Sequence, residues 1–299
     1  MDAPFPFAEP IARGGAPTDI FSATTGLRRS AKSPDRARLH RTIFISDCHL
    51  GTRGCKAEHL ADFLAHNDCR TLYLVGDILD GIQPPGSWYW DDAHTRVIEE
   101  ILFKAQTGTR VVYIPGNHDH MLRAYCGLSL AGVELQRDAV HQTAHGTRLL
   151  VIHGDEFDGV LRQPKWLVLL GGFAYGAVVV LHEIVHEFRR RMAWPYWPLA
   201  GELKNRFKSA VQYIADFESA AATAAGAAGA EGVICGHIHQ PVTRSMDGVI
   251  YGNCGDWVEN CTALVEDRIG NLRLIHWPGT AETGSFETCD TFSIASAAE

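Results

Sequence analysis

The chain has 299 residues, a formal net charge of −8 at pH 7, 46% hydrophobic residues and 21% charged residues. This length and composition are typical of a soluble globular protein with one domain and an insertion. The acidic balance argues against broad nucleic-acid binding, because a phosphate backbone attracts a basic surface. The eight cysteines include no C-x-x-C pair, which favours reduced thiols of a cytosolic protein over a disulfide framework.

Residues 1–40 are expected to form a flexible N-terminal arm. The first ten residues contain three prolines, and no apolar core of useful length follows, so the segment does not resemble a signal peptide. The second half of the arm is basic. This pattern favours a solvated tail, and a contact with an anionic membrane is the alternative.

Five short runs of β-branched and aliphatic residues each end in residues of the types that bind metals. Asp47 and His49 follow residues 42–46, Asp77 follows 72–76, Asn117 follows 111–116, His153 follows 149–152, and His237 and His239 follow 233–236. Strands deliver their C-terminal ends to one edge of a sheet, where open α/β folds bind their ligands. Seven donors are too many for one tetrahedral ion, and they suit two ions held side by side.

The donor set of two carboxylates, one carboxamide and four imidazoles favours Mn, Fe, Co or Zn over Ca or Mg. A bridging carboxylate would keep two ions about 3.5–4 Å apart, which suits an in-line displacement at phosphorus. Asp47 and His49 lie two apart in a segment that is expected to be extended, and so do His237 and His239. The two side chains of each pair should therefore project from the same side of the strand. Each pair either binds a single ion together or contributes one ligand to each of two ions.

The spacing of the candidate ligands predicts where the fold is enlarged. The first three gaps are 30, 40 and 36 residues long, which suits one strand and one helix each, but the gap after His153 is 84 residues long. Residues 154–231 are therefore expected to form an inserted helical cap. Within it, residues 204–230 are rich in alanine, and the Ala/Gly run from 220 is expected to end in a loop. Apolar residues recur there at near-helical spacing: Phe207, Val211, Ile214 and Phe217.

The first half of this insertion contains 16 residues without a charge, 166–181. This run is shorter than the roughly 20 residues that span a bilayer. Arginines 189–191 and an aromatic cluster follow it, a pattern typical of an interfacial element. A buried helical hairpin packed on the core explains the run equally well, so both a hairpin and a membrane-facing or lipid-binding cap stay open. Arg189 and Arg190 are also candidates for binding a diphosphate or a nucleotide.

His182, Glu183 and His186 form an H-E-x-x-H sequence, the helix motif of zinc proteases. Glu187 follows where these proteases normally carry an uncharged residue, and a complete set of metal-type ligands lies elsewhere. An ordinary polar helix face is favoured, and a zinc protease is a distant alternative.

The last part of the chain is expected to complete the core. Residues 232–277 would join residues 41–153 and add strands near 248–253 and 262–265. Asn253, Asp256 and Trp257 either line the site or form a turn. Residues 278–299 are polar and acidic, and a flexible C-terminal tail is expected there.

The ordered motifs resemble those of the calcineurin-like metallophosphoesterases. They are D-x-H at 47–49, G-D-x-x-D at 76–80, G-N-H-D at 116–119, H-G at 153–154 and G-H-x-H at 236–239. Each motif alone is weak, but the ordered set, running through most of residues 41–260, is specific. Residues 44–50, 72–77 and 153–155 further resemble the UDP-2,3-diacylglucosamine pyrophosphatase group. That group carries G-N-R-D, whereas this chain has His118 at the third position.

The resemblance implies an α/β fold, a sandwich of two mixed β-sheets flanked by helices. It also implies roles for the candidate ligands. Asp47, His49 and His239 would hold a first metal and Asn117, His153 and His237 a second, with Asp77 bridging them. His118 would stabilise charge at phosphorus or protonate the leaving oxygen, with Asp119 orienting its imidazole. Asp80 is expected to support a ligand or cap a loop rather than bind an ion.

The implied activity is hydrolysis of a phosphate anhydride or ester by two divalent transition metal ions, with Mn²⁺ favoured over Fe, Co or Zn. The favoured substrate is UDP-2,3-diacylglucosamine, cleaved to 2,3-diacylglucosamine 1-phosphate (lipid X) and UMP in lipid A synthesis. A phosphatase or phosphodiesterase acting on another lipid or nucleotide is the alternative. A degraded phosphoesterase acting as a binding scaffold is disfavoured, because none of the seven ligands is lost.

An acylated substrate implies a cytoplasmic protein that lies peripherally on the inner face of the cytoplasmic membrane. The sequence does not predict an oligomeric state. Trp88 belongs to a Trp-Tyr-Trp run that stacks on a base or an acyl chain, or packs a loop. The weak candidates for substrate contacts are Arg53, Trp88, Arg123, Arg189 and Arg190.

Overall fold

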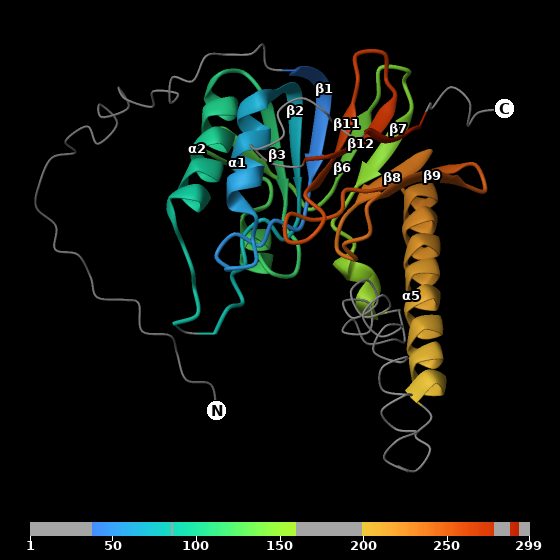
Figure 1. Cartoon of the computed structure of the whole chain (residues 1–299). Helices are drawn as coiled ribbons and strands as arrows, with labels where there is room; N and C mark the ends of the chain where they lie inside the picture. Colours follow the sequence, from blue (N-terminus) through green and yellow to red (C-terminus); the bar gives the residue numbers. More distant parts are fainter. Residues whose placement is uncertain (1–37, 85, 160–198, 278–287, 293–299) are drawn as a thin grey trace, which may run out of the picture. The chain divides into compact units, whose positions relative to one another are not determined.

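The computed structural model describes residues 38–84, 86–159, 199–277 and 288–292, and two β-sheets form its framework (Figure 1). The eight-stranded sheet has the order β13 (Thr288–Phe292), β12 (Leu272–His276), β11 (Thr262–Glu266), β1 (Arg38–Ile45), β2 (Asn67–Val75), β3 (Arg110–Ile114), β5 (Val133–Leu135) and β4 (Ser129–Leu130). The five-stranded sheet has the order β6 (Ala139–Gln142), β7 (Arg148–Val151), β8 (Gly232–Cys235), β10 (Val249–Asn253) and β9 (Val242–Met246).

Both sheets are mixed. Strands β1, β2, β3 and β5 are parallel neighbours in the first sheet, and β7, β8 and β10 in the second. The antiparallel pairs lie outside these parallel sets. A parallel set sends all its C-terminal ends to the same edge of the sheet, so each sheet has one edge at which several loops gather.

Three clusters of buried apolar side chains hold the elements together: one lies between the two sheets, and one lies between each sheet and the helices on its outer face. The sheets pack on each other through Phe44, Tyr73, Val151 and Ile234 among others. Helices α1 (Ala57–His66) and α2 (Asp92–Gln106) lie side by side and cover the outer face of the first sheet (Figure 1). Helix α5 (Leu199–Ala227) packs against β8 and β10 of the second sheet. The predicted sandwich with flanking helices is confirmed.

Helix α5 contacts the sheet through residues four apart, which share one helical face. These residues are Tyr213, Phe217, Ala221 and Ala225. The predicted apolar stripe of this helix is only partly confirmed: Phe217 is on the buried face, whereas Val211 is half-exposed. Alanines let the helix approach the strands closely, so small residues and not the larger Val211 define the buried face. The helix ends at Ala227, inside the Ala/Gly run, and the predicted loop follows.

Two other segments differ from expectation. Strand β13 pairs with β12 in antiparallel register, so residues 288–292 of the predicted flexible tail are a sheet strand. The expected helical cap is represented by α5 and the short 3₁₀ helix η3 (Asp155–Gly159). The charge-free run 166–181, Arg189, Arg190 and the H-E-x-x-H sequence lie outside the described residues. Among the described helices, none combines the length and the hydrophobicity that a bilayer span requires.

A buried carboxylate joins the sheets at the edge opposite the loops that carry the candidate ligands. Glu266 at the end of β11 is fully buried. It accepts hydrogen bonds from Thr42 Oγ1 (2.8 Å), His141 Nε2 (2.8 Å) and the Ala144 amide (2.7 Å), and Arg41 Nε lies 3.0 Å away. Burial raises the pKa of Glu266, but the hydrogen bonds outweigh burial and lower it below 4.5.

We expect Glu266→Ala to lower the free energy of unfolding by about 3–5 kcal/mol, because it leaves buried partners uncompensated. Because the folded pKa lies below the unfolded pKa, this stabilisation is present above pH 4.5 and is lost as the pH falls through the folded value. Urea denaturation at several pH values measures both effects. Glu134→Ala is the control, because its ion pair with Arg110 is exposed and should contribute about 0–1 kcal/mol. Equal losses in the two variants would contradict the prediction.

Candidate metal centre

The seven candidate ligands follow the C-terminal ends of five parallel strands. Asp47 and His49 follow β1, Asp77 follows β2 and Asn117 follows β3 in the first sheet, and the other three histidines follow β7 and β8 of the second. The two sets meet across the sandwich. His153 Nε2 lies 3.4 Å from Asp77 Oδ2, and His239 Nε2 lies 3.2 Å from Asp47 Oδ1. Residues up to 192 positions apart in the sequence therefore share one site.

The backbone at these ligands is not extended, so the expectation of two extended pairs is wrong. Strand β1 ends at Ile45 and β8 ends at Cys235, before the ligands. Five ligands have positive φ: Asp47 (50°), His49 (51°), Asp77 (52°), His237 (70°) and His239 (53°). Such conformations cost about 1–3 kcal/mol each and cluster at functional sites. At these five ligands the left-handed backbone directs the side chains toward the shared site. In an extended strand, successive side chains would point to opposite faces of the sheet.

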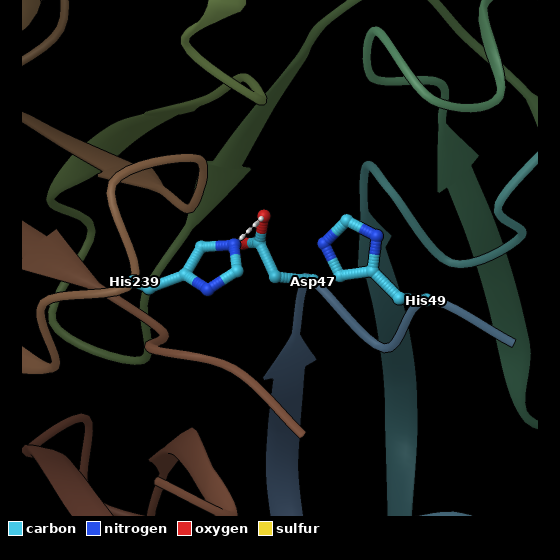
Figure 2. A group of neighbouring side chains, drawn as sticks. All are labelled: Asp47, His49 and His239. Carbon is cyan, nitrogen blue, oxygen red and sulfur yellow. Dashed lines mark ion pairs between the residues drawn. The ribbon is translucent and has the colours of Figure 1, made fainter. Parts of the chain in front are cut away.

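The ligand atoms form two principal groups. One contains Asp47, His49 and His239, and Figure 2 shows these three side chains on the loop after β1 and the loop after β8. The other contains Asp77, His153 and His237. Within each group the ligand atoms lie within 4.8 Å of one another. The first D-x-H pair therefore stays together, whereas His237 and His239 are divided between the groups.

Asp77 lies between the two groups. Besides its contact with His153, it belongs to a third cluster with His49 and His118. Its Oδ1 accepts a hydrogen bond from the His118 amide at 2.7 Å. A carboxylate in this position can reach both groups, as a bridging ligand must.

Two buried oxygen atoms fit a cation. Asn117 Oδ1 is buried and accepts no hydrogen bond within the described part of the chain, and the buried Asp47 Oδ1 has the His239 imidazole beside it at 3.2 Å but no hydrogen bond of good geometry there. Oxygen atoms left in this way are costly unless they meet a partner such as a metal ion. Both are hard donors, which complement the imidazoles in a mixed site.

The histidines are also oriented as metal ligands usually are, with one ring nitrogen inward and the other close to an acceptor. The acceptors are Asp80 Oδ2 for His49 Nδ1 (3.3 Å), Val75 O for His153 Nδ1 (3.0 Å), Asp158 Oδ1 for His237 Nε2 (2.9 Å) and, more loosely, Asp256 Oδ2 for His239 Nδ1 (3.9 Å). The inward atoms are consequently Nε2 in three histidines and Nδ1 in His237.

The carboxylates and imidazoles of the site stabilise one another in their charged forms. Burial raises the pKa of Asp47, but His239 outweighs burial and lowers it to about 2. Burial lowers the pKa of His153, but Asp77 raises it to about 10. In the same way, Asp47 raises the pKa of His239 to about 9 against the effect of burial. Protons on the imidazoles balance the carboxylates, so a bound cation must displace them.

Two glycines leave space that the ligands need. A Cβ at Gly116 would lie 2.3 Å from Asp77 Oδ1 and 2.7 Å from His153 Nε2, and one at Gly236 would lie 2.4 Å from Asp47 Oδ2. We expect Gly116→Ala to displace both neighbours and to lower turnover by about 10²-fold, the usual cost of a small misplacement. Steady-state assays with metal analysis test this. Gly226→Ala in α5, where a Cβ meets nothing within 4 Å, should keep full activity; equal behaviour of the two variants would contradict the prediction.

A cavity of about 500 Å³ lies over the ligand groups, within the range of small-molecule sites. His118 is one of its lining residues, and its side chain is 27% exposed. His118 Nδ1 lies 3.0 Å from Asp80 Oδ1, and its Nε2 lies 4.0 Å from Asp77 Oδ2. An imidazole so placed can face a bound substrate beside the metal ligands.

The expectation that Asp119 orients His118 is wrong. Asp119 is fully buried and accepts hydrogen bonds from the Ile78 amide (2.9 Å), Tyr113 Oη (2.6 Å) and the Gly116 amide (2.5 Å). It therefore fixes the loops that carry Asp77 and Asn117. Asp80 lies against the His118 imidazole instead, and although burial raises its pKa, His49 and His118 lower it to about 2.

The weak substrate candidates that the structure describes do not line the cavity. Arg123 donates to Asp155 (2.6 Å) and to Pro115 O, and so joins two ligand-bearing loops. Arg53 lies over the Tyr89 ring, 4.3 Å from its centroid. Trp88 is half-exposed and stacks on Trp90, with ring centroids 5.6 Å apart. Tyr213, Gln240 and Asn260, none of which was expected, line the cavity.

The sequence pattern of the calcineurin-like phosphoesterases matches residues 40–241, about two thirds of the chain. The chain belongs to the calcineurin-like phosphoesterase family. As a member of this family it is a metal-dependent phosphoesterase, and the clustered ligands fit the divalent metal centre that the family implies.

Curated relatives of this phosphoesterase carry the name UDP-2,3-diacylglucosamine hydrolase. The protein of Chromohalobacter salexigens is 30% identical over 141 residues, which cover 42% of this chain and 55% of the relative. The chain thus spans about half the length of the first relatives that it matches. The protein of Nitrosococcus oceani is 26% identical over 266 residues, 78% of this chain and 99% of the relative. A solved phosphoesterase from E. coli superposes with a TM-score of 0.42 at 14% identity, over 82% of this chain and 96% of that one.

Proposed function

We propose that this phosphoesterase hydrolyses the pyrophosphate bond of UDP-2,3-diacylglucosamine, giving 2,3-diacylglucosamine 1-phosphate and UMP in lipid A synthesis. The observation that carries the proposal is the name shared by its relatives, because two of them align over 92% and 99% of their own lengths. The site supports the same chemistry, since it combines two ligand groups with a cavity large enough for part of a nucleotide sugar.

The proposal includes two divalent transition metal ions, with Mn²⁺ favoured by the mixed oxygen and nitrogen donors. Asp47, His49 and His239 would hold one ion, and Asn117, His153 and His237 the other, with Asp77 bridging. When bound, such a pair neutralises the charge that develops on phosphoryl oxygens. The two side-chain groups and the two buried oxygens support this assignment.

In the proposed reaction His118 acts on the phosphoryl group or on the leaving oxygen. Its partly exposed ring lies beside Asp77 in the cavity lining, within reach of a group bound over the ligands. Asp80 holds Nδ1, which leaves Nε2 to face the substrate. A histidine in this position can donate a proton as the anhydride breaks.

We also propose that the protein works in the cytoplasm, on the inner face of the cytoplasmic membrane. An acylated substrate enters water poorly, so the enzyme has to meet it at a lipid surface. The apolar run 166–181 with arginines 189–191 suits interfacial binding by its sequence pattern.

The alternative substrate class is another lipid or nucleotide phosphate. His118 favours this alternative, because the pyrophosphatase group carries arginine at the corresponding position. The zinc-protease alternative receives no support from the family match, which spans the H-E-x-x-H residues as part of a phosphoesterase.

Purified protein with Mn²⁺ should be assayed against UDP-2,3-diacylglucosamine, soluble nucleotide sugars and p-nitrophenyl phosphates, with products resolved by mass. We expect the acylated substrate to have the highest kcat/KM, with UMP as product and ¹⁸O from water on one product phosphate. The variant His118→Arg is informative here, because it restores the residue of the pyrophosphatase group. If only this variant cleaves UDP-2,3-diacylglucosamine, the natural substrate belongs to the alternative class.

A further inference from the structure

His237 differs from the other three histidine ligands in where its support comes from. His49, His153 and His239 lie against acceptors of the core: Asp80, the Val75 carbonyl and Asp256. The acceptor for His237 Nε2 is Asp158 Oδ1 at 2.9 Å, and Asp158 belongs to η3 in the inserted segment. One ligand of the second group thus depends on residues outside the core.

Helix α5 of the same insertion extends this contact. Tyr213 donates its hydroxyl hydrogen to Asp158 Oδ1 at 3.1 Å, and its side chain is buried. Asp158 Oδ1 therefore receives a tyrosine hydroxyl as well as an imidazole N–H. Tyr213 also lines the cavity over the metal ligands. The link from helix to ligand consists of two consecutive hydrogen bonds.

A second residue of α5 holds the same imidazole by packing. The Phe217 ring lies 6.0 Å from the His237 ring at an interplanar angle of 26°, and Phe157 packs edge-on against Phe217. A Cβ at Gly154 would lie 2.6 Å from the Phe217 ring, so the loop after β7 follows this side chain closely. The Phe217 ring of α5 and the hydrogen bond from His237 to Asp158, which Tyr213 of α5 supports, therefore fix the plane of the His237 ring.

The helix that provides these contacts is itself anchored to the second sheet. Tyr213 and Phe217 continue into Ala221 and Ala225 on the buried face. Glu218, also buried, pairs with Arg244 of β9. Displacement of α5 from the sheet would remove the Tyr213 hydroxyl from Asp158 and the Phe217 ring from His237 together.

We propose that Asp158 and Tyr213 are positioning residues that couple the second metal group to the docking of α5. The inference rests on the proposed two-metal centre. By accepting the Nε2 hydrogen, Asp158 fixes the tautomer in which Nδ1 is unprotonated, and Nδ1 is the atom that faces Asp77 and His153. Tyr213 holds Asp158 in place. Loss of such a supporting acceptor typically lowers metal affinity by about 10–100-fold.

The test measures Mn²⁺ binding to the full chain without turnover, by electron paramagnetic resonance of the free ion during titration. The variants are Asp158→Asn and Tyr213→Phe, and Gln212→Ala is the control, because Gln212 is exposed on α5 and its side chain bonds to Asp216 on the same helix. In Asp158→Asn we expect one of the two ions to bind about 10–100-fold more weakly and the other to be unchanged. Tyr213→Phe should weaken the same ion by a smaller factor, and the control should match the parent.

The inference is overturned if both variants bind two ions with the affinity of the parent. It is also overturned if Tyr213→Phe weakens both ions equally and lowers the melting temperature of the metal-free protein in proportion, because the hydroxyl would then be only structural. Tyr213→Phe removes one buried hydroxyl, so it gives a reading even if Asp158→Asn fails to fold. A parent protein that binds a single ion would instead contradict the two-metal centre of the proposed function.

Discussion

Replacement of Asp77 by alanine is expected to remove metal and turnover together. Asp77 lies between the two ligand groups, contacts His153 at 3.4 Å and is nearly fully buried. Its loss would remove a shared ligand and leave protonated imidazoles without their counter-charge. Lewis-acid stabilisation contributes several kcal/mol, so we expect turnover to fall on the order of 10³-fold or more.

Elemental analysis alongside the assay tests this prediction. Asp92→Ala is a suitable control, because Asp92 is an exposed carboxylate in the first turn of α2. The control should bind metal and turn over like the parent. Full metal content in Asp77→Ala would show that the two groups do not depend on a shared carboxylate.

His118→Ala is expected to keep both ions and to lose about 10²–10⁴ in turnover, the usual contribution of a general acid or base. His118 lines the cavity and its Nδ1 contacts Asp80, whereas the ligand groups of Asp47 and of His153 are complete without it. Asp80→Asn should reduce turnover in the same direction, because the imidazole loses its carboxylate partner.

The readout for His118 is the comparison of metal content with kcat. His276→Ala, at an exposed position in β12, controls for loss of an unrelated imidazole. If His118→Ala loses an ion as well as activity, the third cluster with His49 and Asp77 is itself a metal site, and the assignment of His118 as a non-ligand is wrong.

The sequence was sufficient to predict the strands, their shared edge and the residues that follow them. Continuous apolar runs are typical of strands that are buried on both faces, and the C-terminal ends of parallel strands meet at one edge of a sheet. That is why Asp47 and His239, which come from different sheets, could be expected in one site before their 3.2 Å contact was seen.

The conformation of the loops could not be predicted in the same way. Asp47 and His237 adopt positive φ because tertiary contacts hold them, including a hydrogen bond from the His237 amide to Asp47 Oδ2 at 2.9 Å. Proximity along the chain likewise predicted the wrong carboxylate partner for the His118 imidazole. Asp119 is adjacent, but its side chain turns into the core toward Tyr113, and Asp80 arrives from another strand end.

Helical periodicity was also an incomplete guide in the insertion. Large apolar residues suggested that Val211 is buried, whereas close packing on β8 and β10 uses Ala221 and Ala225. The link from Tyr213 through Asp158 to His237 leaves no sequence pattern at all, because its three members are separated by 55 and 79 positions along the chain.

In the proposed metal centre, two ions lie on either side of Asp77. Anomalous X-ray diffraction from crystals grown with Mn²⁺ would locate these ions, because each bound ion gives its own peak. We predict two peaks about 3.5–4 Å apart, one beside Asp47, His49 and His239 and the other beside Asn117, His153 and His237. A single peak, or two peaks that do not share Asp77, would contradict the two-metal centre.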